Sequence, residues 1–153
     1  MSERKVSKIL SKNDTGETHS HQSGISIPKD VVKKGILPEL GTDRLNPRIT
    51  LAFIDPEGLR WEFQYIYYND AFFGKEPSKS HNEYRLTCVI EFLRHYNAQS
   101  GDTIWFSLTD DNVRHIGIDS RQMVDCGNRK VTKIVLGRGW HYFEFGDDEE
   151  EKE

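Results

Sequence analysis

The sequence has few cysteines, no long apolar run and no familiar catalytic motif, and each absence excludes a class of protein. Cys88 and Cys126 are the two cysteines in 153 residues, too few for a disulfide framework and unlike any zinc-ligand spacing. No segment approaches the ~20 apolar residues that a membrane-spanning helix needs. Residues 1–12 are basic without the apolar stretch of a secretion signal. We therefore expect a cytoplasmic protein with no membrane partner.

Signatures of hydrolases and nucleotide-binding enzymes are also missing. There is no G-x-S-x-G elbow, no P-loop and no G-x-G-x-x-G before a helix. Nuclease chemistry needs acidic residues that hold a divalent ion beside a lysine. Asp55-Pro-Glu57 is not followed by such a lysine, and Glu150-Glu-Lys152 lies in a terminal acidic run. We expect no catalytic residue, no cofactor and no metal in this chain.

One metal site stays open as an alternative. His19 and His21 are two residues apart and point the same way in an extended chain, and Asp14 is a nearby oxygen ligand. The chain offers no HExxH or CxxC partner to complete the site. A metal-dependent nuclease or hydrolase using His19, His21 and Asp14 is therefore the alternative to a binding function.

The net charge of −4 argues at first against a polyanionic partner, but the charge is unevenly placed. Residues 147–153 hold six acids and one base, which leaves 19 acids and 20 bases in the rest of the chain. Bases gather in residues 1–34 and 121–139. Because a local field rather than net charge steers a polyanion, this pattern permits DNA binding. The charge pattern does not establish DNA binding, since a basic cluster is often an ordinary solvated surface.

Alternating and β-branched segments between turn residues predict a mostly β fold. The expected strands are Lys5–Leu10, Gly24–Ile27, Arg48–Ile54, Leu59–Tyr68, Thr103–Leu108, Val113–Ile118, Val131–Leu136 and Trp140–Phe145. Short helices are expected at 28–34 and from about Cys88 to Tyr96, with Thr87 as N-cap of the second. This pattern predicts a closed or half-closed barrel with helices at its ends. Residues 1–146 form one domain, and 147–153 are a disordered tail or a linker stump.

Two long polar connections are the expected functional segments, because such connections in a compact domain are often functional. They are Ser11–Ser23 and Phe73–Glu83, each following a strand. With their flanks they offer these DNA-contacting side chains: Lys8, Lys12, Asn13, Asp14, His21, Gln22, Lys75, Lys79, His81, Asn82, Glu83, Tyr84 and Arg85.

Glu83 and Arg85 are the expected base-reading pair. Arg can bridge guanine O6 and N7, Glu can accept from cytosine N4, and Asn can pair with adenine. In an extended segment both side chains point to the same side. The flanking lysines would hold phosphates and set the register. From composition alone, a surface ion pair between Glu83 and Arg85 is the favoured alternative.

Several motifs in fixed order resemble a known family. They are Lys8-Ile-Leu-Ser-Lys-Asn-Asp-Thr-Gly16, His21-Gln-Ser-Gly-Ile-Ser-Ile-Pro28, Leu45-Asn-Pro47, Ile66-Tyr-Tyr-Asn69, Phe73-Gly-Lys75 and Asn82-Glu-Tyr-Arg85. Together they resemble the N-terminal effector-binding, DNA-recognition domain of EcoRII-type restriction endonucleases. The likeness spans roughly residues 5–120.

The resemblance implies a DNA-binding pseudobarrel of seven to eight strands, as in plant auxin-response transcription factors. Two arms would enter the major groove from opposite sides: the N-arm, Lys8 to Ser26, and the C-arm, Lys75 to Arg85. Lys8, His21 and Ser26 fall on N-arm contact positions. Lys75, Glu83 and Arg85 fall on C-arm contact positions. The implied partners are double-stranded DNA with a short specific site and a nuclease domain in cis or in trans.

The sequence also departs from this family. Ser26 stands where EcoRII has tyrosine, Tyr84 stands where it has lysine, and the C-arm is longer around Pro77 and His81. The recognised bases therefore need not be the same. Three matters stay open: whether the chain is a fragment of a larger nuclease, the role of residues 121–145, and whether the barrel is instead a protein-interaction module.

Overall fold

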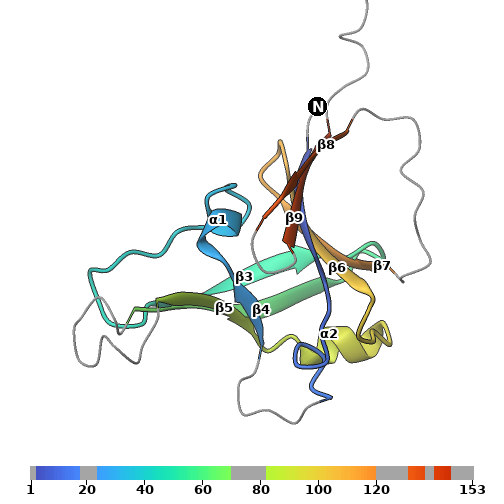
Figure 1. Ribbon diagram of the computed structural model, residues 1–153, viewed down its shortest axis with the longest axis horizontal. Coiled ribbons are helices and arrows are strands. Elements are labelled where there is room, and N and C mark those ends of the chain that lie inside the picture. The colour runs from blue at the N-terminus through green and yellow to red at the C-terminus, as the bar shows by residue number, and fades with distance from the viewer. Residues whose placement is uncertain (1–2, 18–23, 70–81, 120–130, 137–139, 146–153) are drawn as a thin grey trace, which may run out of the picture.

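The computed structural model describes residues 3–17, 24–69, 82–119, 131–136 and 140–145 (Figure 1). Within them the chain forms nine strands and two short helices. In chain order these are β1 (Glu3–Ile9), β2 (Ile25–Ile27), α1 (Lys29–Val32), β3 (Arg48–Ile54), β4 (Arg60–Tyr68), β5 (Glu83–Thr87), α2 (Ile90–His95), β6 (Thr103–Thr109), β7 (Arg114–Asp119), β8 (Val131–Val135) and β9 (Trp140–Phe145). The expected eight strands are confirmed. β5 was not predicted as a strand.

The strands form one curled sheet with the order β2-β5-β4-β3-β7-β6-β1-β9-β8. Neighbours pair antiparallel everywhere except between β3 and β7, where a parallel contact joins Ile54 to His115. We call β2-β5-β4-β3 the first half-sheet and β7-β6-β1-β9-β8 the second. The junction between them is the seam. This is the half-closed barrel that the sequence predicts.

A single apolar core lies between the two half-sheets. Phe53 on β3 packs against Phe63 on β4 and Phe106 on β6, with ring centroids 5.6 and 5.5 Å apart. Phe106 stacks on Trp140 of β9 at 6.1 Å. All four side chains are fully buried. Burial of each such ring stabilises the fold by about 1.5–3 kcal/mol.

The helices pack on this core from different places. α1 buries Val31 and Val32, and α2 buries Phe92 and Leu93. The ring of Phe92 meets Trp61 of β4 edge-on at 5.2 Å, which seats α2 against the first half-sheet. The helix expected from about Cys88 to Tyr96 is therefore present, as Ile90–His95.

The start of α2 differs from its prediction. Thr87 belongs to β5, and its hydroxyl donates to the Gln64 carbonyl at 3.4 Å rather than capping the helix. Cys88 has φ 67°, so the chain turns sharply before Val89 becomes the N-cap. Thr87 therefore pairs within the sheet instead of capping α2, as its local sequence had predicted.

Asp55-Pro-Glu-Gly58 forms the tight turn between β3 and β4. The Gly58 amide donates to the Asp55 carbonyl at 2.9 Å, and Gly58 has φ +87°. The side chain of Asp55 accepts four further hydrogen bonds, from the Glu57 and Leu59 amides, Trp61 Nε1 and the Tyr96 hydroxyl. Asp55 thus ties the β3–β4 turn to α2.

Candidate nucleic-acid interface

The ends of the two arms are neighbouring strands. β2 closes the N-arm and β5 closes the C-arm, and they pair antiparallel with Ile25 opposite Leu86 and Ile27 opposite Tyr84. The N-arm therefore enters this ladder beside the end of β5, and the C-arm enters it beside the end of β2. The two arms leave from opposite ends of one short ladder.

Strand alternation gives this ladder an apolar face and a polar face. Ile25, Ile27 and Leu86 point into the core. Ser26 stands directly opposite Arg85 on the other face, which Glu83 and Thr87 share. The polar face of the β2–β5 ladder, defined by Ser26, Glu83 and Arg85, thus lies between the two arms.

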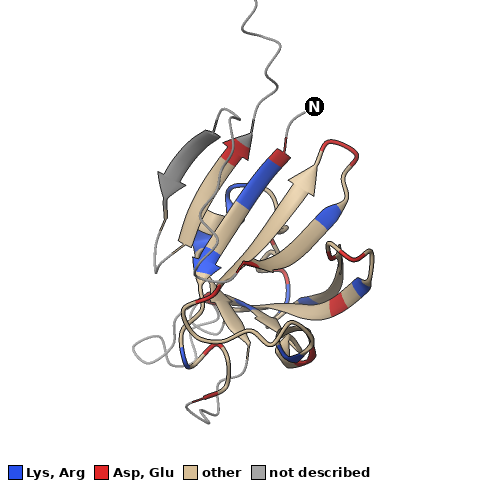
Figure 2. Cartoon of the chain, turned by 90° about the vertical axis from the view of Figure 1, so that its right-hand side faces the viewer, with Lys and Arg blue, Asp and Glu red and all other residues tan. Residues whose placement is uncertain are grey.

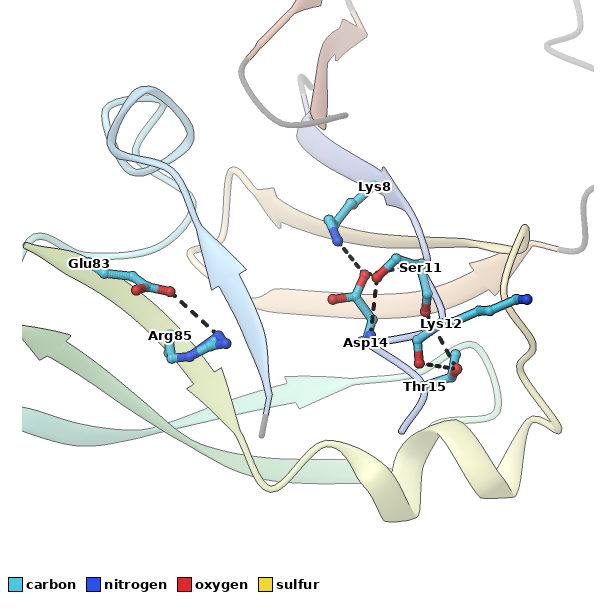
Figure 3. A network of polar contacts seen from close by, with 7 residues as sticks. All are labelled: Lys8, Ser11, Lys12, Asp14, Thr15, Glu83 and Arg85. Atoms are coloured by element: carbon cyan, nitrogen blue, oxygen red, sulfur yellow. Dashed lines mark hydrogen bonds and ion pairs between the residues drawn. The ribbon is translucent and has the colours of Figure 1, made fainter. Parts of the chain in front are cut away.

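Glu83 and Arg85 meet on this face (Figure 3). Glu83 Oε2 lies 3.5 Å from Arg85 Nη1, and the side chains are 33% and 10% exposed. The prediction that they share one side is confirmed. The ion pair that composition favoured is also present, but Arg85 is buried and only Glu83 is partly exposed, so it is not a solvated surface pair.

Residues 12–17 form a compact turn at the start of the N-arm. Ser11 Oγ accepts from the Asp14 amide at 3.1 Å, and Asp14 Oδ2 accepts from the Ser11 amide at 2.9 Å. This reciprocal arrangement is a capping box. Asp14 Oδ2 also pairs with Lys8 Nζ of β1 (Figure 3). Ser11 was absent from the predicted site, although its S-x-x-D spacing carries the signal.

Three predicted contact residues are buried: Arg85 on the polar face of β5, and Tyr84 and Asp14, which have structural partners. Tyr84 is on the apolar face of β5, stacked on Tyr67 at 4.2 Å, and its hydroxyl bonds to the backbone of Leu40. Asp14 is 6% exposed and engaged by Lys8 and Ser11. Alternation along β5 buries Tyr84, and the capping box buries Asp14. Both residues therefore serve the structure of the arms rather than their outer surface.

The other predicted residues divide into two groups. Lys12 is exposed, and Asn13, Ser26 and Asn82 are half-buried. Asn82 Oδ1 is a buried acceptor that receives no hydrogen bond from the residues that the structure describes. His19, His21, Gln22, Lys75, Lys79 and His81 lie outside the described residues, as do the acidic run 147–153 and most of the basic cluster at 121–139.

The segment before the C-arm is anchored by two asparagines. The Asn46 amide donates to Asn69 Oδ1 at 2.8 Å, and the Asn69 amide donates to Asn46 Oδ1 at 3.0 Å. Asn69 Nδ2 also donates to the Arg44 carbonyl at 2.9 Å, and Asn69 is fully buried. These residues belong to the Leu45-Asn-Pro47 and Ile66-Tyr-Tyr-Asn69 motifs, which therefore fix the root of the C-arm.

Charge is distributed unevenly along the second half-sheet (Figure 2). Basic residues follow β1 toward the N-arm, whereas Asp110 and Asp111 occupy the β6–β7 turn beside the opposite end of β1. Glu3 pairs with Thr109 and Lys8 with Ile104, so these ends lie about 17 Å apart. Arg4 and Lys5 lie toward the acidic turn, and Lys8 lies toward the N-arm.

The described residues contain one group with metal-ligand types, Asp55, Glu57 and His95. Asp55 already accepts four hydrogen bonds, which uses the lone-pair positions of its carboxylate. We assign this group a structural role at the β3–β4 turn. The histidines of the predicted metal alternative fall outside the described ranges, and Asp14 is held by Lys8.

In the described part of the chain, neither helix has the length and apolar character needed to cross a bilayer.

Comparisons with known proteins give one family and one fold. A family model described as the N-terminal domain of restriction endonuclease EcoRII matches residues 3–100. The type II restriction enzyme EcoRII of Escherichia coli is 40% identical over 90 residues, covering 55% of this chain and 20% of that enzyme. The structure of the Arabidopsis FUS3–DNA complex superposes with a TM-score of 0.57 at 22% identity, covering 74% of this chain and 94% of FUS3.

Proposed function

The chain belongs to the family of EcoRII N-terminal domains, and from that membership we propose that it binds double-stranded DNA at a short specific sequence. It acts as a recognition domain of restriction–modification origin. In this proposal nuclease activity belongs to a further domain, in cis or in trans, and this domain has no catalysis of its own. The matched segment spans 20% of the E. coli enzyme, which is consistent with a part of a larger protein. Its site of action is the cytoplasm.

The observation that carries this proposal is the pairing of the two arm ends. The β2–β5 ladder pairs three residues of each strand over about 7 Å, and the whole of β5 spans about 13 Å, close to the ~12 Å width of a B-DNA major groove. Arms that leave from opposite ends of the ladder can therefore flank one groove. Ser26, Glu83 and Arg85 lie on the face between them.

Roles follow from side-chain chemistry and position. Arg85 and Glu83 read base edges, assisted by Asn82, Asn13 and His21. Lys8, Lys12, Lys75 and Lys79 hold phosphates. Ser26 and His81 complete the contact set. His21, Lys75, Lys79 and His81 enter on sequence alone. Tyr84 leaves the contact set because it points into the core, and Asp14 leaves it because Lys8 and Ser11 hold its carboxylate. Arg85 is buried as well, but it stays in the set because it lies on the polar face of the β2–β5 ladder.

Selection of duplexes from a random library tests the proposal. The purified chain should enrich one short motif, and its affinity should fall as salt rises because phosphate contacts release counterions. No enriched motif would favour a protein-interaction module instead. A plasmid-nicking assay with magnesium, combined with metal analysis, tests the alternative enzyme. Stoichiometric metal or cleavage by this chain would overturn the proposal.

A further inference from the structure

Asp14 connects three parts of the N-arm. Its carboxylate accepts from the Ser11 amide and pairs with Lys8 Nζ, while its own amide donates to Ser11 Oγ. The turn is completed by backbone bonds from Thr15 to Ser11 at 3.2 Å and from Glu17 to Lys12 at 2.9 Å. One buried carboxylate thus joins β1 to the turn that carries Lys12 and Asn13 (Figure 3).

The pairing leaves Lys8 able to bind a phosphate. An ammonium group has three donors, and the carboxylate of Asp14 uses one of them. Lys8 remains 13% exposed at the end of β1, where the N-arm begins. Lys12 is exposed on the next turn. Asp14 therefore limits the positions of two predicted phosphate contacts at once.

We propose that Asp14 is a positioning residue for DNA binding, which orients Lys8 and presets the turn of residues 12–17 without touching the duplex. This inference rests on the proposed function. Its physical basis is preorganisation: a turn formed before binding avoids the cost of ordering the segment in the complex. It assigns Asp14 a role other than base reading or metal binding.

The direction of the affinity change in one variant distinguishes this positioning role from a purely electrostatic effect. Asp14→Asn removes a negative charge near the proposed phosphate path, so charge alone predicts tighter binding. Positioning predicts the opposite, a loss of about tenfold on the selected duplex, comparable with removal of one good contact. Loss of well-placed phosphate contacts should also reduce the slope of log affinity against log salt, by about 0.9 for each contact.

Asp111→Asn is the matched control. It makes the same charge change at the β6–β7 turn, at the end of the sheet opposite Lys8. It should leave affinity and salt slope unchanged. Ser11→Ala, which changes no charge, should weaken binding in the same direction as Asp14→Asn because it breaks the other half of the capping box. Hydrogen exchange at the Thr15 and Glu17 amides reports the turn, and the thermal midpoint reports the fold.

The effect of Asp14→Asn should shrink when Lys8 is already alanine, because the two residues then act through one contact. Tighter binding by Asp14→Asn overturns the proposal. So does a changed base preference with an unaltered salt slope, which would make Asp14 a base reader. Unchanged affinity in both Asp14→Asn and Ser11→Ala, with faster exchange at Thr15 and Glu17, also overturns it. If the unsubstituted chain selects no duplex, the proposed function itself is wrong, and this result is distinct from a failure of the role assigned to Asp14.

Discussion

Glu83 and Arg85 lie two residues apart on the polar face of β5, with Oε2 and Nη1 separated by 3.5 Å. The pair brings a carboxylate and a guanidinium together before any ligand is bound. Glu83 is one-third exposed, whereas Arg85 is 10% exposed, so the guanidinium is largely removed from water before DNA binds. In the proposed complex, Arg85 exchanges its contact with Glu83 for one with a base edge.

Replacement of Arg85 by alanine should affect specific binding alone. We expect a loss of about 1–3 kcal/mol on the selected duplex and little change on random DNA, since a bidentate contact to guanine carries sequence information. Fluorescence anisotropy with both duplexes measures this. Arg60→Ala removes the same charge at the far end of β4 and should leave the discrimination intact. Equal losses on both duplexes would mean that Arg85 does not read bases.

Lys12→Ala should weaken all duplexes about equally. Its side chain is exposed on the turn of residues 12–17, where a phosphate contact carries no base information. The salt slope should fall by about 0.9, the contribution of one phosphate. The same outcome is expected for Lys79→Ala. A selective loss on the cognate duplex would contradict the assigned role.

Acid should destabilise the fold through Asp55. Burial by itself would raise the pKa of Asp55, but hydrogen bonds from Tyr96, Trp61 and the Leu59 and Glu57 amides outweigh it, so the pKa lies below its ordinary value. A lowered folded-state pKa gives stability that is present above the unfolded pKa of about 3.9 and is lost as pH falls through the folded value. Urea unfolding of the wild type between pH 6 and 3 should show this loss.

Asp55→Ala should cost about 3 kcal/mol near neutral pH, because it leaves several buried donors unsatisfied. Its stability should also vary less with pH between 6 and 3 than that of the wild type. An equally steep pH dependence in the variant would assign the acid sensitivity to other carboxylates.

Gly24→Ala should loosen the arms. Gly24 has φ +86°, and an added Cβ would lie 2.4 Å from the Leu86 carbonyl oxygen, which is backbone that cannot easily move. Gly58→Ala is the matched control, with φ +87° and no atom within 4 Å of the added Cβ. The control should cost about 1 kcal/mol from backbone strain, and Gly24→Ala distinctly more. Thermal unfolding compares them. Equal costs would show that β2 yields freely beside β5.

Much of the sheet could be predicted because one face of each strand is apolar. Arg48–Ile54 and Trp140–Phe145 were predicted with the bounds that the structure gives. β5 was missed because it is short, and Glu83, Arg85 and Thr87 dominate its pattern while Tyr84 and Leu86 alone mark the core face. A short strand with charged residues on its polar face therefore has a sequence pattern typical of a loop.

The candidate site was predictable by residue type and less so by direction. Glu83 and Arg85 share a face because alternation fixes it. The same alternation turns Tyr84 inward. The sequence analysis placed Tyr84 among the contact residues because its neighbours Glu83 and Arg85 are charged. For Asp14 the relevant signal was local capping chemistry, S-x-x-D, rather than acidity. Pairing of β2 with β5 joins residues about 60 positions apart, and local patterns carry no trace of it.

The seam has a consequence for the complex. In the described part of the chain, the strand pairing between the two half-sheets joins Ile54 to His115. The N-arm starts on β1 in one half and ends on β2 in the other, whereas the C-arm connects β4 and β5 within a single half. A duplex bound by both arms would thus hold the two half-sheets together across the opening of the barrel. The bound molecule should melt at a higher temperature than the free one, as a single unit.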